Sequence, residues 1–281
     1  MPPIVSVIAP GSMGSAIAAC LTAHGVEVRT SLAGRSPASA ARAAKACMRE
    51  ADDAALVAAD IILSIVPPGE AVGLAERLAP ALATAGRKPV YADCNAISPA
   101  TVARIAAVLA PTGCAFVDAG IIGPPPAAEA RVTRIYLSGP DAQRVAVLAE
   151  YGLDLPVLDG PVGHASAMKL SYAGITKGFT ALATMMLLAA GRAGTDAALL
   201  RELTTSQPQL LAWLTRQAPR MPDKAYRWVA EMEEIAAFTG ADPAAGALFT
   251  AAARLYERIA ADQAGNGAET AALLRFFAPP A

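Results

Sequence analysis

A glycine-rich stretch near the N-terminus has the residue types and spacing for binding an anion. A β-branched run over residues 4–9 leads into Gly11, Ser12, Met13 and Gly14, which small and apolar residues follow at helical spacing. In a strand–turn–helix, one such glycine lets the backbone approach a pyrophosphate, another lets helix and strand pack closely, and the helix N-terminus attracts the anion. We therefore expect these four residues to bind a dinucleotide. A purely structural turn is the alternative, since glycine-rich turns between strand and helix are common.

The residues after the second expected strand, 26–30, indicate which dinucleotide is bound. A site for NAD has Asp or Glu here to bind the ribose hydroxyls, but residues 29–36 contain no acidic side chain. Arg35 and Ser36 instead suit a 2′-phosphate, because a guanidinium fork and a hydroxyl both donate hydrogen bonds to phosphate oxygens. This pattern favours NADP as the cofactor. The alternative for Arg35 is a solvated loop arginine.

Two more loops follow expected strands, at the edge where ligands bind in such sheets. Val66 and Pro67 end the apolar run 60–66, and Asn95 follows the run 89–93. We expect these three residues to line the cofactor site. Ordinary turn chemistry is the alternative, because a serine followed by a proline just downstream also makes a good helix N-cap.

Short apolar runs alternate with helical stretches through the first 160 residues. This alternation predicts an α/β fold, a Rossmann domain with a doubly wound, mostly parallel sheet. We expect strands over residues 4–9, 26–30, 60–66, 89–93, 115–118, 134–138 and 155–158, and helices over 12–24, 37–48, 69–83, 99–109 and 141–151.

Beyond residue 163 the sequence predicts helices only, over 165–191, 196–204, 207–217, 224–239, 243–261 and 266–277. The chain is thus expected to consist of a dinucleotide-binding domain at 1–160 and an all-α substrate and dimerisation domain at 161–281. The helix 165–191 is apolar nearly all round after Lys177 and needs covering on all sides. We expect it to be buried and to contribute to a homodimer, with a tetramer as the alternative.

The composition argues against several other classes of protein. The chain of 281 residues has 23 basic and 24 acidic side chains, so it lacks the basic excess typical of nucleic-acid binding. Its longest apolar stretch, 178–190, is about 13 residues long, and a membrane span needs about 20. Four scattered cysteines and two histidines favour neither a metal site nor disulfides. The chain starts Met-Pro-Pro without a basic leader, so we expect a cytoplasmic protein.

Five short motifs follow one another along the chain. They are the glycine turn ending at Gly14, an apolar strand ending Val66-Pro67, Asp93…Ser98-Pro99, Asp118-Ala119-Gly120-Ile121-Ile122-Gly123, and Gly163-His164-Ala165-Ser166-Ala167-Met168-Lys169. This order resembles the β-hydroxyacid dehydrogenases, the superfamily that contains 3-hydroxyisobutyrate and 6-phosphogluconate dehydrogenases. The resemblance covers nearly the whole chain. Residues 172–178 and 224–235 are similar to a 6-phosphogluconate-dehydrogenase-like branch.

The resemblance implies that Lys169 is the catalytic acid/base. Elementary chemistry agrees, because oxidation of a secondary alcohol needs a group that takes the proton from oxygen. An amine can do this, whereas a guanidinium stays protonated. The chain has only 5 lysines against 18 arginines, so a lysine here is suggestive. The alternative is a lysine on the surface of a helix.

Further side chains near Lys169 have two interpretations each. Lys177 lies eight residues later and shares a helix face with it, so it either holds an anionic substrate or forms an ion pair. His164 either reaches the site or has a capping or loop role. The acidic side chains further along favour a solvated helix face over a substrate contact: Glu231, Glu233 and Glu234.

The expected substrate site departs from the family pattern at three places. Asn95-Ala96 stands where the family has Ser-Thr, Ile122-Gly123-Pro124 where it has a carboxylate-binding Ser-Gly-Gly, and Ala173 where it has asparagine. Each change removes a polar group, so we expect a more apolar pocket than in the sugar-acid members. The residues expected to contact the substrate are Asn95, Ile122, Gly123, Pro124, Tyr172 and Lys177.

The sequence therefore predicts an NADP-dependent oxidoreductase acting on a β-hydroxy acid or a related secondary alcohol or ketone. The reduced polarity favours a larger or less polar β-hydroxy acid, hydroxy-amino acid or ketone over a simple short hydroxy acid or 6-phosphogluconate. Two alternatives remain at this point, an imine reductase of the same architecture and a non-catalytic NADPH-binding regulator. The presence of Lys169 argues against both.

Overall fold

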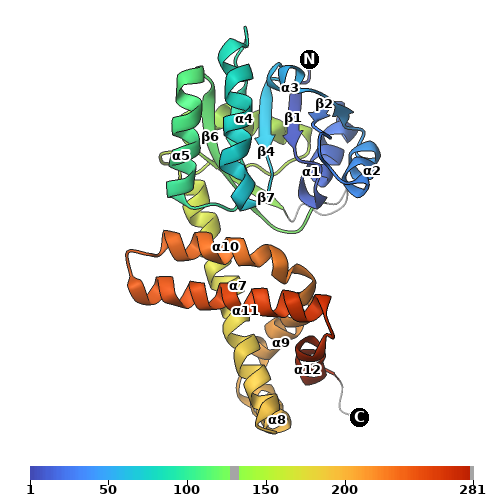
Figure 1. Ribbon diagram of the computed structural model, residues 1–281, viewed down its shortest axis with the longest axis vertical. Helices are drawn as coiled ribbons and strands as arrows, with labels where there is room; N and C mark the ends of the chain where they lie inside the picture. Colours follow the sequence, from blue (N-terminus) through green and yellow to red (C-terminus); the bar gives the residue numbers. More distant parts are fainter. Residues whose placement is uncertain (127–132, 279–281) are drawn as a thin grey trace. The chain divides into compact units, whose positions relative to one another are not determined.

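The chain divides into two compact units, Met1–Leu170 and Ser171–Ala281 (Figure 1). The computed structural model describes residues 1–126 and 133–278. A Rossmann-like sheet forms the first unit and helices form the second, which confirms the predicted fold class. The division falls after Leu170 rather than after residue 160, because the first turn of the long helix is hydrogen-bonded to the sheet.

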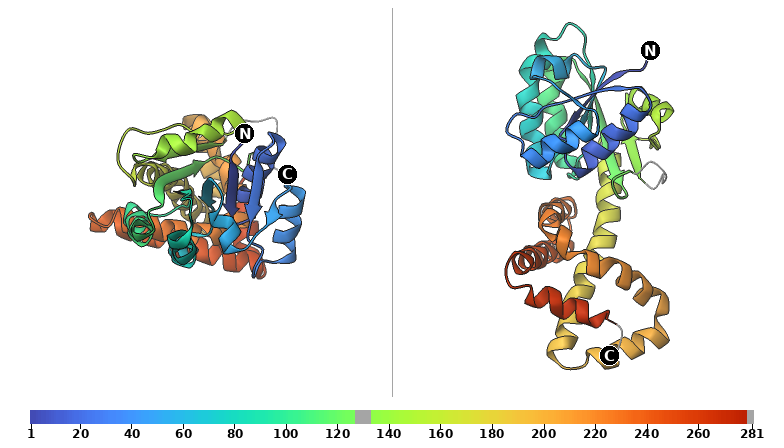
Figure 2. Two further views of the ribbon diagram at one scale, coloured as in Figure 1. Left: turned by 90° about the horizontal axis from the view of Figure 1, so that it is seen from above. Right: turned by 90° about the vertical axis from the view of Figure 1, so that its right-hand side faces the viewer.

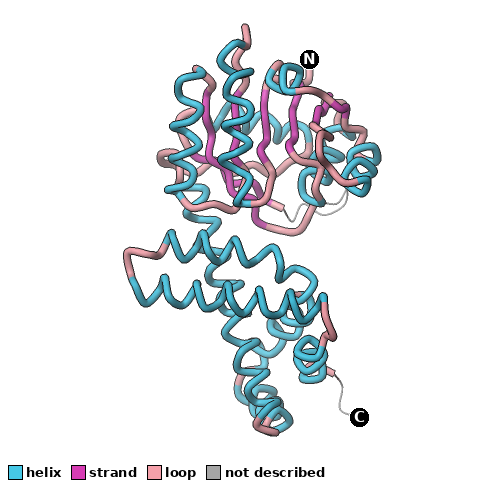
Figure 3. Tube along the Cα trace, in the orientation of Figure 1, coloured by secondary structure: helices cyan, strands magenta, loops and turns pink. Residues whose placement is uncertain are grey.

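The sheet has seven strands in the order β3-β2-β1-β4-β5-β6-β7 (Figure 3). All neighbours are parallel except β6 and β7, which pair antiparallel. The strands are β1 (Ile4–Ile8), β2 (Glu27–Thr30), β3 (Arg49–Glu50), β4 (Ile61–Ser64), β5 (Val90–Asp93), β6 (Ala115–Ile122) and β7 (Arg134–Ser138). Every residue of β4 and β5 is buried, as expected for central parallel strands.

Helices cover both faces of this sheet (Figure 2). Ile17 of α1 packs in one core cluster with Val5, while Leu78 of α4 and Ile105 of α5 pack in a second cluster with Ile62. The helices of this unit are α1 (Ser12–Ala23), α2 (Pro37–Lys45), α3 (Asp53–Val57), α4 (Ala71–Thr84), α5 (Pro99–Leu109) and α6 (Ala142–Ala146), with 3₁₀ turns at Pro68–Glu70, Ala110–Thr112 and Val147–Tyr151.

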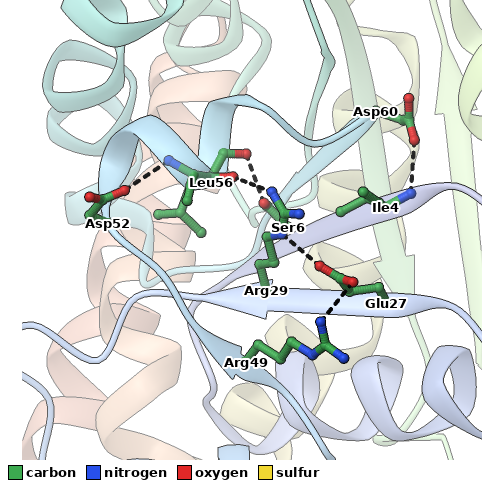
Figure 4. A network of polar contacts seen from close by, with 9 residues as sticks. Ile4, Ser6, Glu27, Arg29, Arg49, Asp52, Leu56 and Asp60 are labelled. Carbon is green, nitrogen blue, oxygen red and sulfur yellow. Dashed lines mark hydrogen bonds and ion pairs between the residues drawn. The ribbon is translucent and has the colours of Figure 1, made fainter.

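The sheet differs from the prediction at its two ends. Strand β3 was not expected, because its two residues are polar and exposed and show no hydrophobic pattern. Glu27 of β2 links it to the sheet by accepting from Arg29 Nε and Arg49 Nη1, each at 2.9 Å (Figure 4). The strand expected over 155–158 is wrong, since this segment makes only isolated bridges such as Leu137 with Val157.

The described residues of the second unit, 171–278, form helices, connecting loops and two 3₁₀ turns, Ala218–Arg220 and Pro222–Lys224, and no strand. Its helices are the greater part of α7 (His164–Arg192), then α8 (Asp196–Ser206), α9 (Pro208–Gln217), α10 (Ala225–Phe238), α11 (Pro243–Ala264) and α12 (Ala268–Phe276). Helices α10 and α11 pack against each other. The six predicted helices are confirmed, with ends that differ by a few residues.

Helix α7 is less covered than the sequence predicts. Five large apolar side chains on it are exposed at positions that repeat every three or four residues: Tyr172, Ile175, Phe179, Leu182 and Met186. The expectation that α7 is buried all round is therefore wrong for the single chain. By length and composition α7 would also suit a membrane span, as would the core helix of a soluble protein. The cytoplasmic location stays a prediction.

Candidate active site

The glycine turn lies between β1 and α1, as predicted. A Cβ at Gly14 would overlap the carbonyl oxygen of Ala9 and lie 3.3 Å from Val7 Cγ1, so this position needs glycine for helix and strand to pack. A Cβ at Gly11 would meet nothing within 4 Å, which leaves the backbone open there. Ser12 and Met13 form the first turn of α1, whose N–H groups have no partner within the helix. The turn has the form of an anion cradle.

Arg35 and Ser36 lie before α2, but each already has a partner. Arg35 Nη1 is 3.6 Å from a carboxylate oxygen of Glu70, an exposed ion pair of little strength. Ser36 caps α2 by accepting a hydrogen bond from the backbone N–H of Ser39 at 3.3 Å. A phosphate can replace both of these contacts, because the ion pair and the helix cap lie at the surface.

Arg42 is a residue near the glycine turn that the sequence analysis missed. Its Nε donates to the carbonyl oxygen of Pro10 at 3.1 Å, and its Nη2 donates to Ser39 Oγ at 2.8 Å. Arg42 therefore connects α2 to the turn that precedes Gly11. The position of Arg42 on the first turns of α2, three residues after Ser39, could have identified it from the sequence. It did not, because an arginine on a helix usually faces solvent.

The loops after β4 and β5 meet at Asn95. Its amide Nδ2 donates to Ser64 Oγ and to Asp93 Oδ2, each at 2.9 Å, and its Oδ1 accepts from the N–H of Val66 at 2.7 Å. The structure thus brings Asn95 together with the Val66-Pro67 loop, as expected for one site. Both amide hydrogens of Asn95 bind within the protein, so its local role is to hold the two loops in register.

A row of buried polar side chains crosses the sheet at this level. Ser64, Asp93, Asp118 and Ser138 are register partners on β4, β5, β6 and β7, and all four are fully buried. The pKa of Asp93 is raised to about 7, chiefly by burial and to a smaller extent by the nearby Asp118, although hydrogen bonds from Asn95 lower it. The pKa of the Tyr91 hydroxyl is also raised, chiefly by burial.

Asp118 fastens the start of α7 to the sheet. Its Oδ2 accepts hydrogen bonds from Ser138 Oγ and from the backbone N–H groups of Gly163 and Ser166, each at 3.0 Å. Its Oδ1 accepts from Ser166 Oγ at 2.5 Å. The carboxylate is thus surrounded by four neutral donors, two of which belong to the first turn of the helix that carries Lys169.

Lys169 lies directly against β6. A Cβ placed on Gly120 would be 2.8 Å from Lys169 Cβ and 2.7 Å from the carbonyl oxygen of Ala165. Only glycine permits this approach of helix and strand. Lys169 is half-buried and has further interactions of its own. His164 begins α7, is exposed, and lies against Gly160.

The expected substrate residues fall into two groups. Ile122 ends β6, Gly123 follows with a φ of 126° in the region that favours glycine, and Pro124 accepts from the hydroxyl of Thr133. Tyr172 and Lys177 belong to the second unit. The site predictions for these residues stay predictions.

Lys177 forms the ion pair that was one of its two interpretations. Its Nζ contacts a carboxylate oxygen of Glu231 and lies 5.1 Å from the centre of the Trp228 ring. The backbone carbonyl oxygen of Lys177 accepts from the hydroxyl of Tyr256 at 2.5 Å. Glu231 is only 6% exposed, so its assignment to a solvated helix face is wrong. Nowhere in residues 1–126 or 133–278 do three His, Cys, Asp or Glu side chains gather as metal ligands.

A Rossmann sheet with a glycine turn between its first strand and helix defines a dinucleotide-binding protein of the Rossmann type. A family model described as the NAD binding domain of 6-phosphogluconate dehydrogenase matches residues 4–149, and one described as a domain of unknown function (DUF1932) matches residues 190–259. The chain belongs to the first of these families and, with it, to the β-hydroxyacid dehydrogenase superfamily. The resemblance predicted from the motifs is thereby confirmed.

Three proteins illustrate these relationships. An uncharacterized 28.5 kDa protein of Methanothermus fervidus is 28% identical over 135 residues, 48% of this chain and 49% of that protein, so the match spans about half of this curated relative. A conserved protein of unknown function, described as structurally similar to 3-hydroxyacid dehydrogenases, is 29% identical with a TM-score of 0.68, covering 92% of this chain and 98% of its own. The 3-hydroxyisobutyrate dehydrogenase of Mycobacterium tuberculosis, solved with L-serine, is 20% identical with a TM-score of 0.72, covering 99% and 100%, and shares the fold.

Proposed function

We propose that the protein is an NADP-dependent oxidoreductase that transfers a hydride between the nicotinamide and a β-hydroxy acid or a related secondary alcohol or ketone. The observation that carries the proposal is the placement of Lys169, whose Cβ lies against Gly120 near the carboxyl end of β6. Ligands of open α/β sheets bind outside the carboxyl ends of the strands. A lysine at that edge of the sheet, which also carries the glycine turn after β1, has the position of a proton carrier.

The proton and the hydride leave the substrate from different atoms. When bound, the nicotinamide supplies the hydride acceptor for alcohol oxidation and the donor for the reverse reaction. Lys169 takes the proton from the alcohol oxygen during oxidation and returns it during reduction. The glycine turn fits the pyrophosphate, because space is open beside Gly11 and the N–H groups of Ser12 and Met13 start α1.

The choice of NADP rests on the cations around the start of α2. Arg35 and Ser36 follow β2. Arg42 is connected to Ser36 through Ser39, whose hydroxyl bonds both side chains. Arg35→Asp is expected to lower the ratio of kcat/KM for NADP over NAD by about tenfold or more. The substitution replaces a hydrogen-bond donor to the 2′-phosphate by a carboxylate, which is negatively charged like the phosphate itself. Arg104→Asp, on the exposed side of α5, is the control and should leave the ratio unchanged. An unchanged ratio in Arg35→Asp would remove the support for NADP.

The substrate is proposed to be less polar than a sugar acid. Ile122 lacks the hydroxyl, and Pro124 the N–H group, that would bind a carboxylate at the end of β6. NADP reduction followed at 340 nm tests this class with a panel of β-hydroxy acids: 3-hydroxyisobutyrate, L-serine, longer and less polar β-hydroxy acids, and 6-phosphogluconate. NADPH oxidation by a cyclic imine is measured beside it. Efficient turnover of 6-phosphogluconate would refute the apolar pocket. Turnover of the imine alone would refute the reaction class.

Lys169→Ala tests the proton carrier. The variant is expected to lower kcat about 10²–10⁴-fold, the usual contribution of a general acid/base, while the Kd for NADPH changes little. Lys45→Ala, an exposed lysine at the end of α2, is the matched control and should retain full activity. Full activity of Lys169→Ala would overturn the assignment.

We also propose that two copies associate through α7. The stripe from Tyr172 to Met186 is apolar, exposed and spaced like the seam of a helix pair. Leu182→Glu is expected to yield a monomer on sedimentation analysis, whereas Leu248→Glu, an equally exposed leucine on α11, should not. A wild-type monomer would refute the homodimer.

A further inference from the structure

The first turn of α7 is capped from a distance. Of its four initial N–H groups, those of His164 and Ala167 bind the nearby carbonyl oxygens of Pro161 and Gly163. The N–H of Ala165 instead donates to Ser138 Oγ, and that of Ser166 donates to Asp118 Oδ2. Most helices are capped by the residue just before them. Here two of the N–H groups are capped by side chains of the sheet, Ser138 and Asp118, which lie 27 and 48 residues earlier in the chain.

We infer that Asp118 is a positioning residue for Lys169, which holds the first turn of α7 on β6 and thereby sets where the lysine amine lies. The inference rests on the proposed function of Lys169. It concerns a side chain that touches neither cofactor nor substrate in that proposal, because Asp118 is fully buried beneath the helix.

Two contacts on one face of β6 carry the argument. Asp118 and Gly120 are two residues apart, so they face the same side of the sheet. Ser166 and Lys169 are three residues apart, so they lie on the same side of α7. Asp118 binds the first of these helix residues, and Gly120 admits the second to its close approach. Together, the two contacts fix the position of α7 on β6 at Lys169, both along the strand and away from it.

The chemistry of the four donors explains why a carboxylate stands at this position. Its two oxygens accept hydrogen bonds from two hydroxyls and two backbone N–H groups, at 2.5–3.0 Å. An asparagine can keep its oxygen toward three of these donors and turn its NH₂ group toward Ser166 Oγ, where the hydrogen bond reverses direction. All four contacts then lose the strengthening that the negative charge gives them. Asp118→Asn is therefore a nearly isosteric way to loosen the attachment.

Asp118→Asn is expected to lower kcat per NADPH-binding site about 10–100-fold, since misplacement by about 1 Å has effects of that size. The Kd for NADPH should stay within about twofold. The assay uses whichever β-hydroxy acid of the panel given under the proposed function the wild type oxidises fastest. Amide hydrogen exchange should rise in peptides covering residues 163–170 and stay unchanged in α11.

A double-mutant cycle separates positioning from mere support of the fold. If Asp118 acts through Lys169, Asp118→Asn should cause no further loss of kcat in the Lys169→Ala background. An equal loss in both backgrounds, or a loss of NADPH-binding sites in proportion to activity, would overturn the inference. Full activity of Lys169→Ala alone would instead refute the proposed function, so the two failures are distinguishable.

Gly120→Ala provides a second test that leaves the carboxylate intact. The added methyl would lie 2.7 Å from the carbonyl oxygen of Ala165 and 2.8 Å from Lys169 Cβ, so the helix must shift. We expect a fall in kcat similar to that of Asp118→Asn. Gly73→Ala on α4 is the control, because a Cβ there meets nothing within 4 Å. Full activity of Gly120→Ala would contradict a position set by β6.

Discussion

Helix α7 is held by one buried carboxylate in each unit, and the two are held in different ways. Asp118 in the Rossmann unit accepts from four neutral donors, two hydroxyls and two backbone N–H groups. Glu231 in the helical unit binds the ammonium group of Lys177, which also lies over the Trp228 ring. Both carboxylates are almost inaccessible to solvent.

The difference lies in what each arrangement determines. Hydrogen bonds from fixed backbone groups are directional, so the contacts of Asp118 define where the first turn of α7 lies. An ion pair between two long side chains is less directional, but removing one member leaves a charge in a buried site. The Rossmann unit thus uses its carboxylate for placement, and the helical unit uses its own for cohesion.

Lys177→Met should have the largest effect on stability. It leaves Glu231 buried without its cation, and breaking a buried pair in this way costs about 3–5 kcal/mol. Urea denaturation followed by circular dichroism measures the free energy of unfolding, with the exposed Lys45→Met as control. The double variant Lys177→Met with Glu231→Leu should regain much of the loss. A single variant within about 1 kcal/mol of wild type would show that the pair adds no cohesion.

Asp118→Asn should cost less, about 1–3 kcal/mol, because its hydrogen bonds lose the strengthening of a charged acceptor but no buried charge is left unpaired. Its effect on kcat should nevertheless exceed that of Lys177→Met if the contrast between placement and cohesion holds. Denaturation and steady-state kinetics on both variants make the comparison. A larger loss of stability than in Lys177→Met, with unchanged kcat, would reverse the assignment of the two roles.

A third test compares Asp93 in the Rossmann unit with Asp262 in the helical unit, through the pH dependence of the free energy of unfolding. Burial raises the pKa of Asp93 to about 7 from 3.8, so between about pH 4 and 7 the folded state binds more protons than the unfolded state. The contribution of Asp93 to stability therefore falls as pH rises through this window and is constant above it. The stability difference between wild type and Asp93→Asn should fall accordingly. If the free energies of unfolding of wild type and Asp93→Asn changed in parallel with pH, a neutral Asp93 near pH 6 would be excluded.

Asp262 in the helical unit supplies a control of opposite sign. The N–H group of Thr270, and then that of Glu269, lower the pKa of its carboxyl group. Its contribution is present above its unfolded pKa and is lost as pH falls through the lower folded value. The difference between wild type and Asp262→Asn should therefore shrink only in acid, below about pH 4.

The sequence predicts the features that depend on neighbouring residues better than those that depend on distant ones. The glycine turn and the bounds of α7 depend on neighbouring residues, and the structure places both where the pattern indicates. The role of Asp118 depends on Ser138 and Ser166, 20 and 48 residues away, and no local pattern records those bonds. Such long-range polar contacts require the fold to be known.

Glu231 illustrates a signal that was present but outweighed. It lies among other acidic residues, which favours a solvated face, yet it also lies three residues after Trp228 and four before Ile235, on the buried side of α10. Helical spacing therefore indicates burial, while composition indicates exposure. The partner that decides the matter, Lys177, lies 54 residues earlier.

Tyr256→Phe should have the smallest effect and gives the sharpest view of the helical unit. The hydroxyl of Tyr256 donates to the backbone carbonyl oxygen of Lys177, while the ring meets Trp228 edge-on at 5.1 Å. Removing the hydroxyl alone should cost about 1 kcal/mol, with the exposed Tyr226→Phe as a neutral control. If the ion pair and this hydrogen bond hold α7 independently, the losses in Tyr256→Phe and Lys177→Met add to within about 0.5 kcal/mol. A strong coupling between them would mean that the ion pair, like Asp118, fixes the position of the helix backbone, and the distinction between placement and cohesion would not hold.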